Sequence, residues 1–154
     1  MTGTMTWAAM DVHARSTYAA SLDVMTGEVA RQRFDTGAVE PVVSWLTGLP
    51  GPVQVRACYE AGPTGFGPYR AAVAAGIDCQ VIAPSKTPRP SGDRNKSDRR
   101  DTDLLLRQLM AGALTPVAVP SVTFEAASRS RPRARAGAYG LDALPAPALQ
   151  AAVA

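Results

Sequence analysis

Apolar runs and alternating segments dominate the first part of the chain. Residues 7–12 and 17–24 are apolar runs, and residues 28–34 alternate valine and phenylalanine with arginine and glutamine. Alternation with a period of two is typical of a half-exposed strand, and the Thr26-Gly27 pair before it predicts a hairpin turn. We therefore expect three antiparallel strands at the beginning of a sheet.

Helical and strand-like patterns alternate over the next stretch. Apolar residues recur at helical spacing over residues 39–49, and residues 68–75 form a second helical segment that stops at a glycine. Residues 53–59 and 77–82 are apolar runs short enough to be strands. The order of three strands, helix, strand, helix and strand predicts an α/β fold, a mixed sheet with flanking crossover helices.

The character of the chain changes after the last of these strands. Residues 83–94 are rich in proline and basic side chains, which predicts an exposed loop. A helix over residues 97–110 follows, with Ser97 as its N-cap and an apolar stripe of leucines. Residues 125–154 are rich in alanine and arginine without any period, so we expect one domain over residues 1–124 and an irregular tail, either disordered or read out of frame.

Charge and composition narrow the function classes. A hydrophobic content of 46% and a charged content of 19% are those of a globular protein, and the net charge of +3 mildly favours an anionic partner. Basic side chains are concentrated in one segment, and we interpret them as a nucleic-acid contact, the alternative being a solvated loop. They are Lys86, Arg89, Arg94, Lys96, Arg99 and Arg100.

The two cysteines and the hydropathy pattern indicate the compartment. Cys58 and Cys79 both lie in apolar runs, which predicts buried free thiols rather than a disulfide framework. No window contains the roughly 20 apolar residues that a membrane helix needs. The amino terminus lacks the basic start and long apolar stretch of a signal peptide. The sequence predicts a cytoplasmic protein with no membrane partner.

Four carboxylates are candidates for a metal site. Asp11 ends the first predicted strand and Glu60 the fourth, and adjacent strand ends lie about 5 Å apart in a sheet. Asp98 and Asp101 are three residues apart on a helix and share a face. A divalent cation would relieve the repulsion among them, and Mg²⁺, or Mn²⁺, suits oxygen ligands. Taken one by one, a strand-end aspartate can be a turn former, and Asp98 can simply favour the helix N-terminus.

Five motifs in order resemble those of one protein family. They are Asp11-Val12-His13, the string from Tyr59 to Gly65, Ala83-Pro84-Ser85, Gly92-Asp93-Arg94, and the string from Lys96 to Asp101. The chain resembles, from Asp11 to about Phe124, the DEDD transposases of insertion sequences, the "one-ten" group of RNA-guided recombinases. The resemblance implies an RNase H-like (RuvC-like) fold.

The resemblance also implies a chemistry and a set of partners. Asp11, Glu60, Asp98 and Asp101 would be the catalytic, metal-binding tetrad, acting on DNA phosphodiester bonds. DNA, a guide RNA and further copies of the enzyme would be the partners. His13 is interpreted as an ordinary strand-end residue rather than a phosphate contact. Asp103 is left out of the tetrad because it lies about 200° around the helix from Asp101.

The chain departs from the family in two respects. Thr102 follows the last acid, where the family usually has alanine. Family members also carry a helical connector and a C-terminal domain with a nucleophilic serine, for which this chain has no room. We therefore expect a truncated transposase domain that is inactive alone.

Two other interpretations stay open. One is a non-catalytic nucleic-acid-binding fragment of a degenerate transposon, which the activity of the isolated chain would distinguish. The other is an actin-like nucleotide-binding fold, which also starts with a strand ending in aspartate. That class needs a glycine-rich phosphate loop in its first hairpin, where this chain offers only Gly27.

Overall fold

The computed structural model describes residues 5–49, 54–84 and 97–129. The chain divides into two compact units, Met1–Val117 and Ala118–Ala154, and the first contains the sheet. Within the described residues, no helix combines the length and the apolar character required to cross a bilayer.

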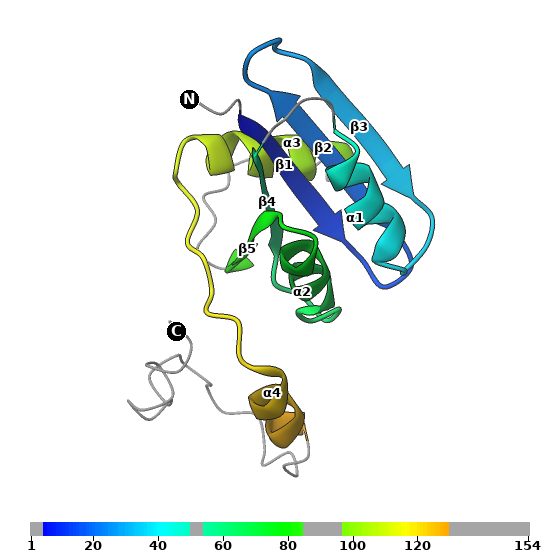
Figure 1. Ribbon diagram of the computed structural model, residues 1–154, viewed down its shortest axis with the longest axis vertical. Coiled ribbons are helices and arrows are strands. Elements are labelled where there is room, and N and C mark those ends of the chain that lie inside the picture. The colour runs from blue at the N-terminus through cyan, green and yellow to red at the C-terminus, as the bar shows by residue number, and fades with distance from the viewer. Residues whose placement is uncertain (1–4, 50–53, 85–96, 130–154) are drawn as a thin grey trace. The chain divides into compact units, whose positions relative to one another are not determined.

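One mixed sheet forms the centre of the first unit (Figure 1). Its strands are β1 (Met5–Val12), β2 (Thr17–Asp23), β3 (Val29–Phe34), β4 (Gln54–Glu60) and β5 (Asp78–Ile82). The spatial order is β3-β2-β1-β4-β5, with β1 antiparallel to β2 and parallel to β4. β3 pairs antiparallel with β2, and β5 parallel with β4. The predicted three-stranded antiparallel start is confirmed, and β1 becomes the central strand.

Helices cover both faces of this sheet. They are α1 (Glu40–Thr47), α2 (Gly67–Ala74) and α3 (Asp98–Met110). α1 and α2 lie on one face, and α3 crosses the other behind β1 and β2 (Figure 1). The boundaries differ from the predicted ones by at most two residues. The expected fold class, an α/β mixed sheet with flanking helices, is confirmed and is consistent with an RNase H-like fold.

The core beneath α3 explains how closely this helix approaches the sheet. Ala9 and Ala20 on the central strands are fully buried, and their small side chains leave room for the leucines of α3. Burial of such an apolar stripe is the main force that holds an amphipathic helix on a sheet. The cluster comprises Ala9, Ala20, Cys58, Ile82, Leu105, Leu106 and Leu109.

A close backbone contact fixes the beginning of α1 beside the end of β1. A Cβ atom at Gly37 would lie 2.2 Å from the carbonyl oxygen of Ala14, in the loop between β1 and β2. Only glycine permits this approach. The loop that follows β1 and the segment that leads into α1 are therefore held together.

The second unit contains a helix, α4 (Val122–Arg129), where the sequence predicted an irregular tail from residue 125. Ser121 Oγ accepts a hydrogen bond from a first-turn backbone N–H at 3.3 Å, and Glu125 forms an ion pair with Arg129. These are local contacts, which can stabilise one short helix without a long apolar period. The prediction was wrong for residues 125–129, and residues 130–154 lie outside the described part of the chain.

Candidate metal centre

Two of the predicted acids lie at the same edge of the sheet. β1 and β4 are parallel with Met10 opposite Tyr59, so Asp11 and Glu60 occupy the next position on each strand. Two residues earlier, Ala9 lies opposite Cys58, and both belong to the core beneath α3. Because side chains two residues apart on a strand share a face, Asp11 and Glu60 belong to the α3 face of the sheet.

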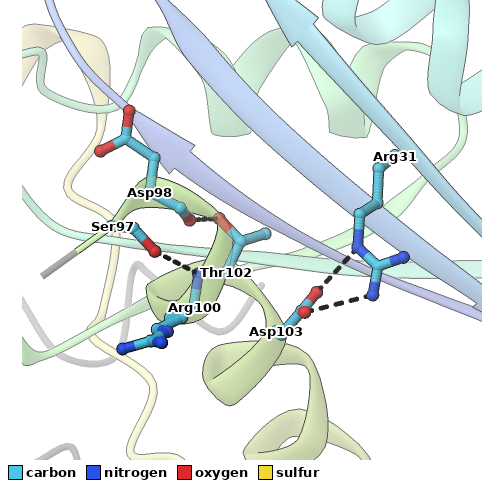
Figure 2. Close-up of polar contacts among 6 residues, drawn as sticks. All are labelled: Arg31, Ser97, Asp98, Arg100, Thr102 and Asp103. Atoms are coloured by element: carbon cyan, nitrogen blue, oxygen red, sulfur yellow. Dashed lines mark hydrogen bonds and ion pairs between the residues drawn. The ribbon is translucent and has the colours of Figure 1, made fainter. Parts of the chain in front are cut away.

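The first turn of α3 places a third acid at this edge. Ser97 is the N-cap, and its hydroxyl oxygen accepts a hydrogen bond from Arg100 N at 3.3 Å (Figure 2). Thr102 is fully buried, and its Oγ1 donates to the backbone oxygen of Asp98 at 2.7 Å (Figure 2). These contacts fix the backbone of Asp98 at the start of the helix, where the helix dipole favours a negative charge. The predicted N-cap is confirmed.

Asp11 and Asp98 converge, and they do so together with His13. Each of the three residues offers one potential ligand atom, and these atoms lie within 4.8 Å of one another. His13 Nε2 donates a hydrogen bond to Asp11 Oδ2 at 3.0 Å, since an ionised carboxylate can only accept. The side chains of His13 and Asp11 are 48% and 25% exposed, so the cluster is open to solvent.

This donor set fits a divalent cation. Two carboxylates this close repel each other, and a hard cation with oxygen ligands removes that repulsion. The imidazole nitrogen of His13 is a softer donor and suits Mn²⁺ or another transition metal better than Mg²⁺. Alternatively, His13 keeps its hydrogen bond and orients Asp11, as outer ligands often do in metal sites.

The other two members of the predicted tetrad lie next to the cluster without joining it. Within the described residues, the converging set is limited to Asp11, His13 and Asp98. Glu60 ends the neighbouring strand, and Asp101 lies one helical turn after Asp98. The roles of Glu60 and Asp101 therefore remain predictions.

Sequence reasoning underrated His13. The signal was present, because His13 is two residues after Asp11 and so belongs to the same face of the extended chain. The hydrogen bond to Asp11 is what distinguishes it from an ordinary strand-end residue.

Asp103 is engaged elsewhere. Arg31 on β3 donates from Nε to Asp103 Oδ1 at 3.2 Å and from Nη2 to Oδ2 at 3.1 Å (Figure 2). The hydrogen bond with Asp103 raises the pKa of the Arg31 guanidinium. Asp103 thus has a structural partner outside the cluster, which agrees with its omission from the tetrad.

The turn after Glu60 is held by a buried tyrosine. Tyr59 is fully buried, and its hydroxyl donates to the backbone oxygen of Gly65 at 3.1 Å. The same oxygen accepts from Tyr69 N at 3.3 Å. Gly65 has a φ of 73°, a conformation that favours glycine. The glycine-rich segment is therefore a turn held by hydrogen bonds, directly after the strand end that carries Glu60.

The predicted basic surface is described only in part. Arg99 and Arg100 lie exposed in the first turn of α3, directly after Asp98. Lys86, Arg89, Arg94 and Lys96 lie outside the described residues. A cation-rich flank therefore begins next to the cluster.

The two cysteines are buried free thiols, as predicted. Burial raises the pKa of the Cys58 thiol far above its ordinary value, and that of Cys79 to about 12. Neither thiol has the depressed pKa of a reactive or metal-binding cysteine.

Comparison with known proteins identifies two similar sequences, while no protein-family profile matches the chain. Transposase y4qE of Sinorhizobium fredii, a name that its curators qualify as provisional, is 53% identical over 81 residues. This match covers 53% of the chain and 20% of that protein. The transposase for insertion sequence element IS1533 of Leptospira borgpetersenii is 43% identical over 54 residues, 35% of this chain and 16% of that protein.

A solved structure shows only a distant likeness. It is a simian T-cell lymphotropic virus intasome in complex with a PP2A regulatory subunit, with a TM-score of 0.38 and 12% identity. The alignment covers 98% of this chain and 47% of that one, and so low a score carries no argument. The matched part of this chain thus spans about a fifth of its curated relatives, which are named as transposases, one of them of an insertion sequence element.

Proposed function

We propose that this chain is part of an insertion-sequence transposase that acts on DNA phosphodiester bonds with a divalent cation. The observation that carries the proposal is the convergence of potential ligand atoms from Asp11, His13 and Asp98 within 4.8 Å. The names of the curated relatives supply the substrate class, DNA. Within this class, we assign the chain to the RuvC-like DEDD group on its motifs.

The ligands of the proposed cation are Asp11 and Asp98, assisted by Glu60 and Asp101. Bound there, Mg²⁺ or Mn²⁺ would polarise a phosphodiester and stabilise the leaving oxygen. Asp11 contributes a carboxylate from the rigid central strand, and Asp98 contributes one from the capped start of α3. His13 orients Asp11 through its hydrogen bond.

Basic residues beside the cluster would hold the nucleic acid. Arg99 and Arg100 follow Asp98 directly and are exposed, so their guanidinium groups can neutralise phosphates that flank the metal centre. Lys86, Arg89, Arg94 and Lys96 extend this positive segment in the sequence. By its resemblance to the DEDD group, the assembled enzyme would also use a guide RNA and form a homo-oligomer.

Thermal unfolding with added cation tests the metal centre. A cation that binds only the folded protein stabilises it, by about 1.4 kcal/mol at ten times its dissociation constant. For a domain of this size that corresponds to a rise in Tm of roughly 3–6 °C. Asp11→Asn and Asp98→Asn should each lose most of the rise with Mg²⁺ or Mn²⁺.

Glu28→Gln is the matched control, because Glu28 is exposed in the turn between β2 and β3, at the opposite end of β2 from the loop that carries His13. It should keep the full rise. Equal loss in Glu28→Gln would show that the cation acts through general charge. If the parent chain binds DNA but its Tm does not rise with Mg²⁺ or Mn²⁺, the result would support the alternative, a non-catalytic nucleic-acid-binding fragment.

A further inference from the structure

A cavity of about 100 Å³ opens beside His13, on the face of the sheet opposite α3. Its floor is the end of β1, and its walls are the segments that lead into α1 and α2. His13 belongs both to this cavity and to the cluster with Asp11 and Asp98. The cavity therefore borders the proposed metal centre, and His13 is the residue that the two share.

The walls of the cavity are mostly apolar. Met10 and Val42 are 2% and 5% exposed, and Pro68 is buried beside them. Such walls suit the faces of a flat ring rather than an anion. An anion would lose its hydrating water there and find no hydrogen-bond donors on the apolar walls to replace it. The occupant is expected to be a neutral group with an apolar face.

One polar atom of the lining lacks a partner. The hydroxyl oxygen of Thr64 is buried and has no hydrogen-bond partner among the described residues. Buried polar groups are nearly always paired, so such an atom marks a place where a ligand or a water completes the bonding. Thr64 can donate to a carbonyl oxygen or accept from an N–H group.

The N-termini of two helices favour a carbonyl oxygen, rather than an N–H group, as the partner of Thr64. Val39 and Phe66, the N-cap residues of α1 and α2, make no side-chain capping hydrogen bond, although the Tyr59 hydroxyl accepts from Tyr69 N in the first turn of α2. Val39, and Gly67 in the first turn of α2, line the cavity. Helix N-termini carry partial positive charge, which favours oxygen acceptors nearby.

We propose that this cavity accepts an unpaired pyrimidine base of the nucleic acid whose phosphate lies at the Asp11–Asp98 cluster, an assignment that rests on the proposed function. A pyrimidine has apolar faces and carbonyl oxygens at its edge, which match the walls and Thr64. An engineered cavity of about 150 Å³ holds benzene, and this one, at about 100 Å³ with an open mouth, has room for most of a single ring and none for a fused purine. His13 lies at the boundary between the base and the phosphate.

Methyl NMR of the full chain labelled at methionine tests the proposal, with Met10 as the reporter. Thymidine 5′-monophosphate should shift the Met10 signal, while deoxyribose 5-phosphate and deoxyadenosine 5′-monophosphate should not. Thr64→Val keeps the shape and removes the hydroxyl, so the affinity for thymidine 5′-monophosphate should fall about fivefold, as for one hydrogen bond. Thr47→Val, which removes a hydroxyl at the far end of α1, is the matched control and should bind like the parent.

A second variant covers the case in which Thr64→Val does not fold. A Cβ at Gly67 meets no atom within 4 Å, so Gly67→Val has space beside the cavity and should block the base. Equal shifts with the abasic and the pyrimidine probes, or an unchanged affinity in both variants, would overturn the proposal. The titrations are run without a divalent cation, so that they report on the cavity alone. Loss of the cation-dependent rise in Tm would instead overturn the proposed function.

Discussion

Arg31 and Asp103 join β3 to α3 across 72 positions of the sequence, through two parallel hydrogen bonds of 3.2 and 3.1 Å. Among the strands that the structure describes, β3 pairs with β2 alone. The pair thus ties an edge strand to the helix whose first turn carries Asp98. Its two-point geometry restrains both the distance and the direction of α3 at this position.

A double-mutant cycle on this pair measures its contribution to stability. Arg31→Met and Asp103→Asn should each lower the free energy of unfolding, and the coupling between them should be below about 1 kcal/mol, because both side chains are partly exposed. Urea unfolding of the parent, the two single variants and the double variant gives the coupling. Full additivity would mean that the pair does not restrain α3. The cation-dependent rise in Tm should survive in Asp103→Asn.

The loss of cation affinity on replacement of Glu60 or Asp101, compared with that of Asp11, tests the predicted tetrad. Glu60→Gln and Asp101→Asn should weaken cation binding less than Asp11→Asn, because their ligand atoms do not belong to the converging cluster. Calorimetric titration with Mn²⁺ compares the dissociation constants. Unaltered binding in both variants would reduce the tetrad to its two converging aspartates.

His13 can be tested as a ligand or as an orienting residue. If it only orients Asp11, His13→Gln should bind Mg²⁺ and Mn²⁺ with nearly parental affinity, since an amide N–H can replace the donor to Asp11. If it is a ligand, the loss should be larger for Mn²⁺ than for Mg²⁺, because imidazole suits the softer cation. The ratio of the two dissociation constants, parent against variant, decides between the roles.

The sequence predicted the elements with strong periodicity and the acids that end them. The leucine stripe of α3 and the apolar run before Asp11 repeat with the periods of a helix and a strand. These side chains can be buried together only if the segments adopt those structures. Contacts between distant segments could not be foreseen in this way, since nothing in the pattern relates Arg31 to Asp103. α4 was missed because a cap and one ion pair stabilise it, without a long apolar stripe.

The buried thiols should be unreactive in the folded protein. Alkylation needs the thiolate, and burial raises the pKa of Cys79 to about 12, so near pH 8 its thiolate fraction is far below that of a free cysteine. The raised pKa favours the folded state below the ordinary thiol pKa of about 8.5, and this contribution is lost as the pH rises toward 12. Mass spectrometry after iodoacetamide treatment should find label only in urea. Rapid labelling of the native chain would contradict the burial.

The exposed arginines after Asp98 should contribute to nucleic-acid affinity by charge. Replacement of Arg99 and Arg100 by glutamine should weaken binding to duplex DNA and lower the slope of log affinity against log salt by about 0.9 for each phosphate that is no longer neutralised. Fluorescence anisotropy at several salt concentrations measures the slope. Replacement of Arg107, which is exposed in the last turn of α3, is the matched control. An unchanged slope in the Arg99 and Arg100 variant would show that these residues do not neutralise phosphates.

Tyr59 should connect the stability of the sheet to the geometry of the proposed metal centre. Tyr59→Phe keeps the ring and removes the hydroxyl that bonds Gly65 and the backbone of Tyr69, so two polar groups next to the turn lose their partner. Each such loss costs on the order of 1 kcal/mol, so the free energy of unfolding should fall by about 1–2 kcal/mol. The Mn²⁺ affinity should also fall severalfold, because the turn that follows Glu60 is no longer fixed. Tyr69→Phe, which spares the Tyr59 hydroxyl, should show neither effect. A Tyr59→Phe variant that is destabilised but binds Mn²⁺ like the parent would assign the hydroxyl to folding alone and leave Glu60 positioned by β4.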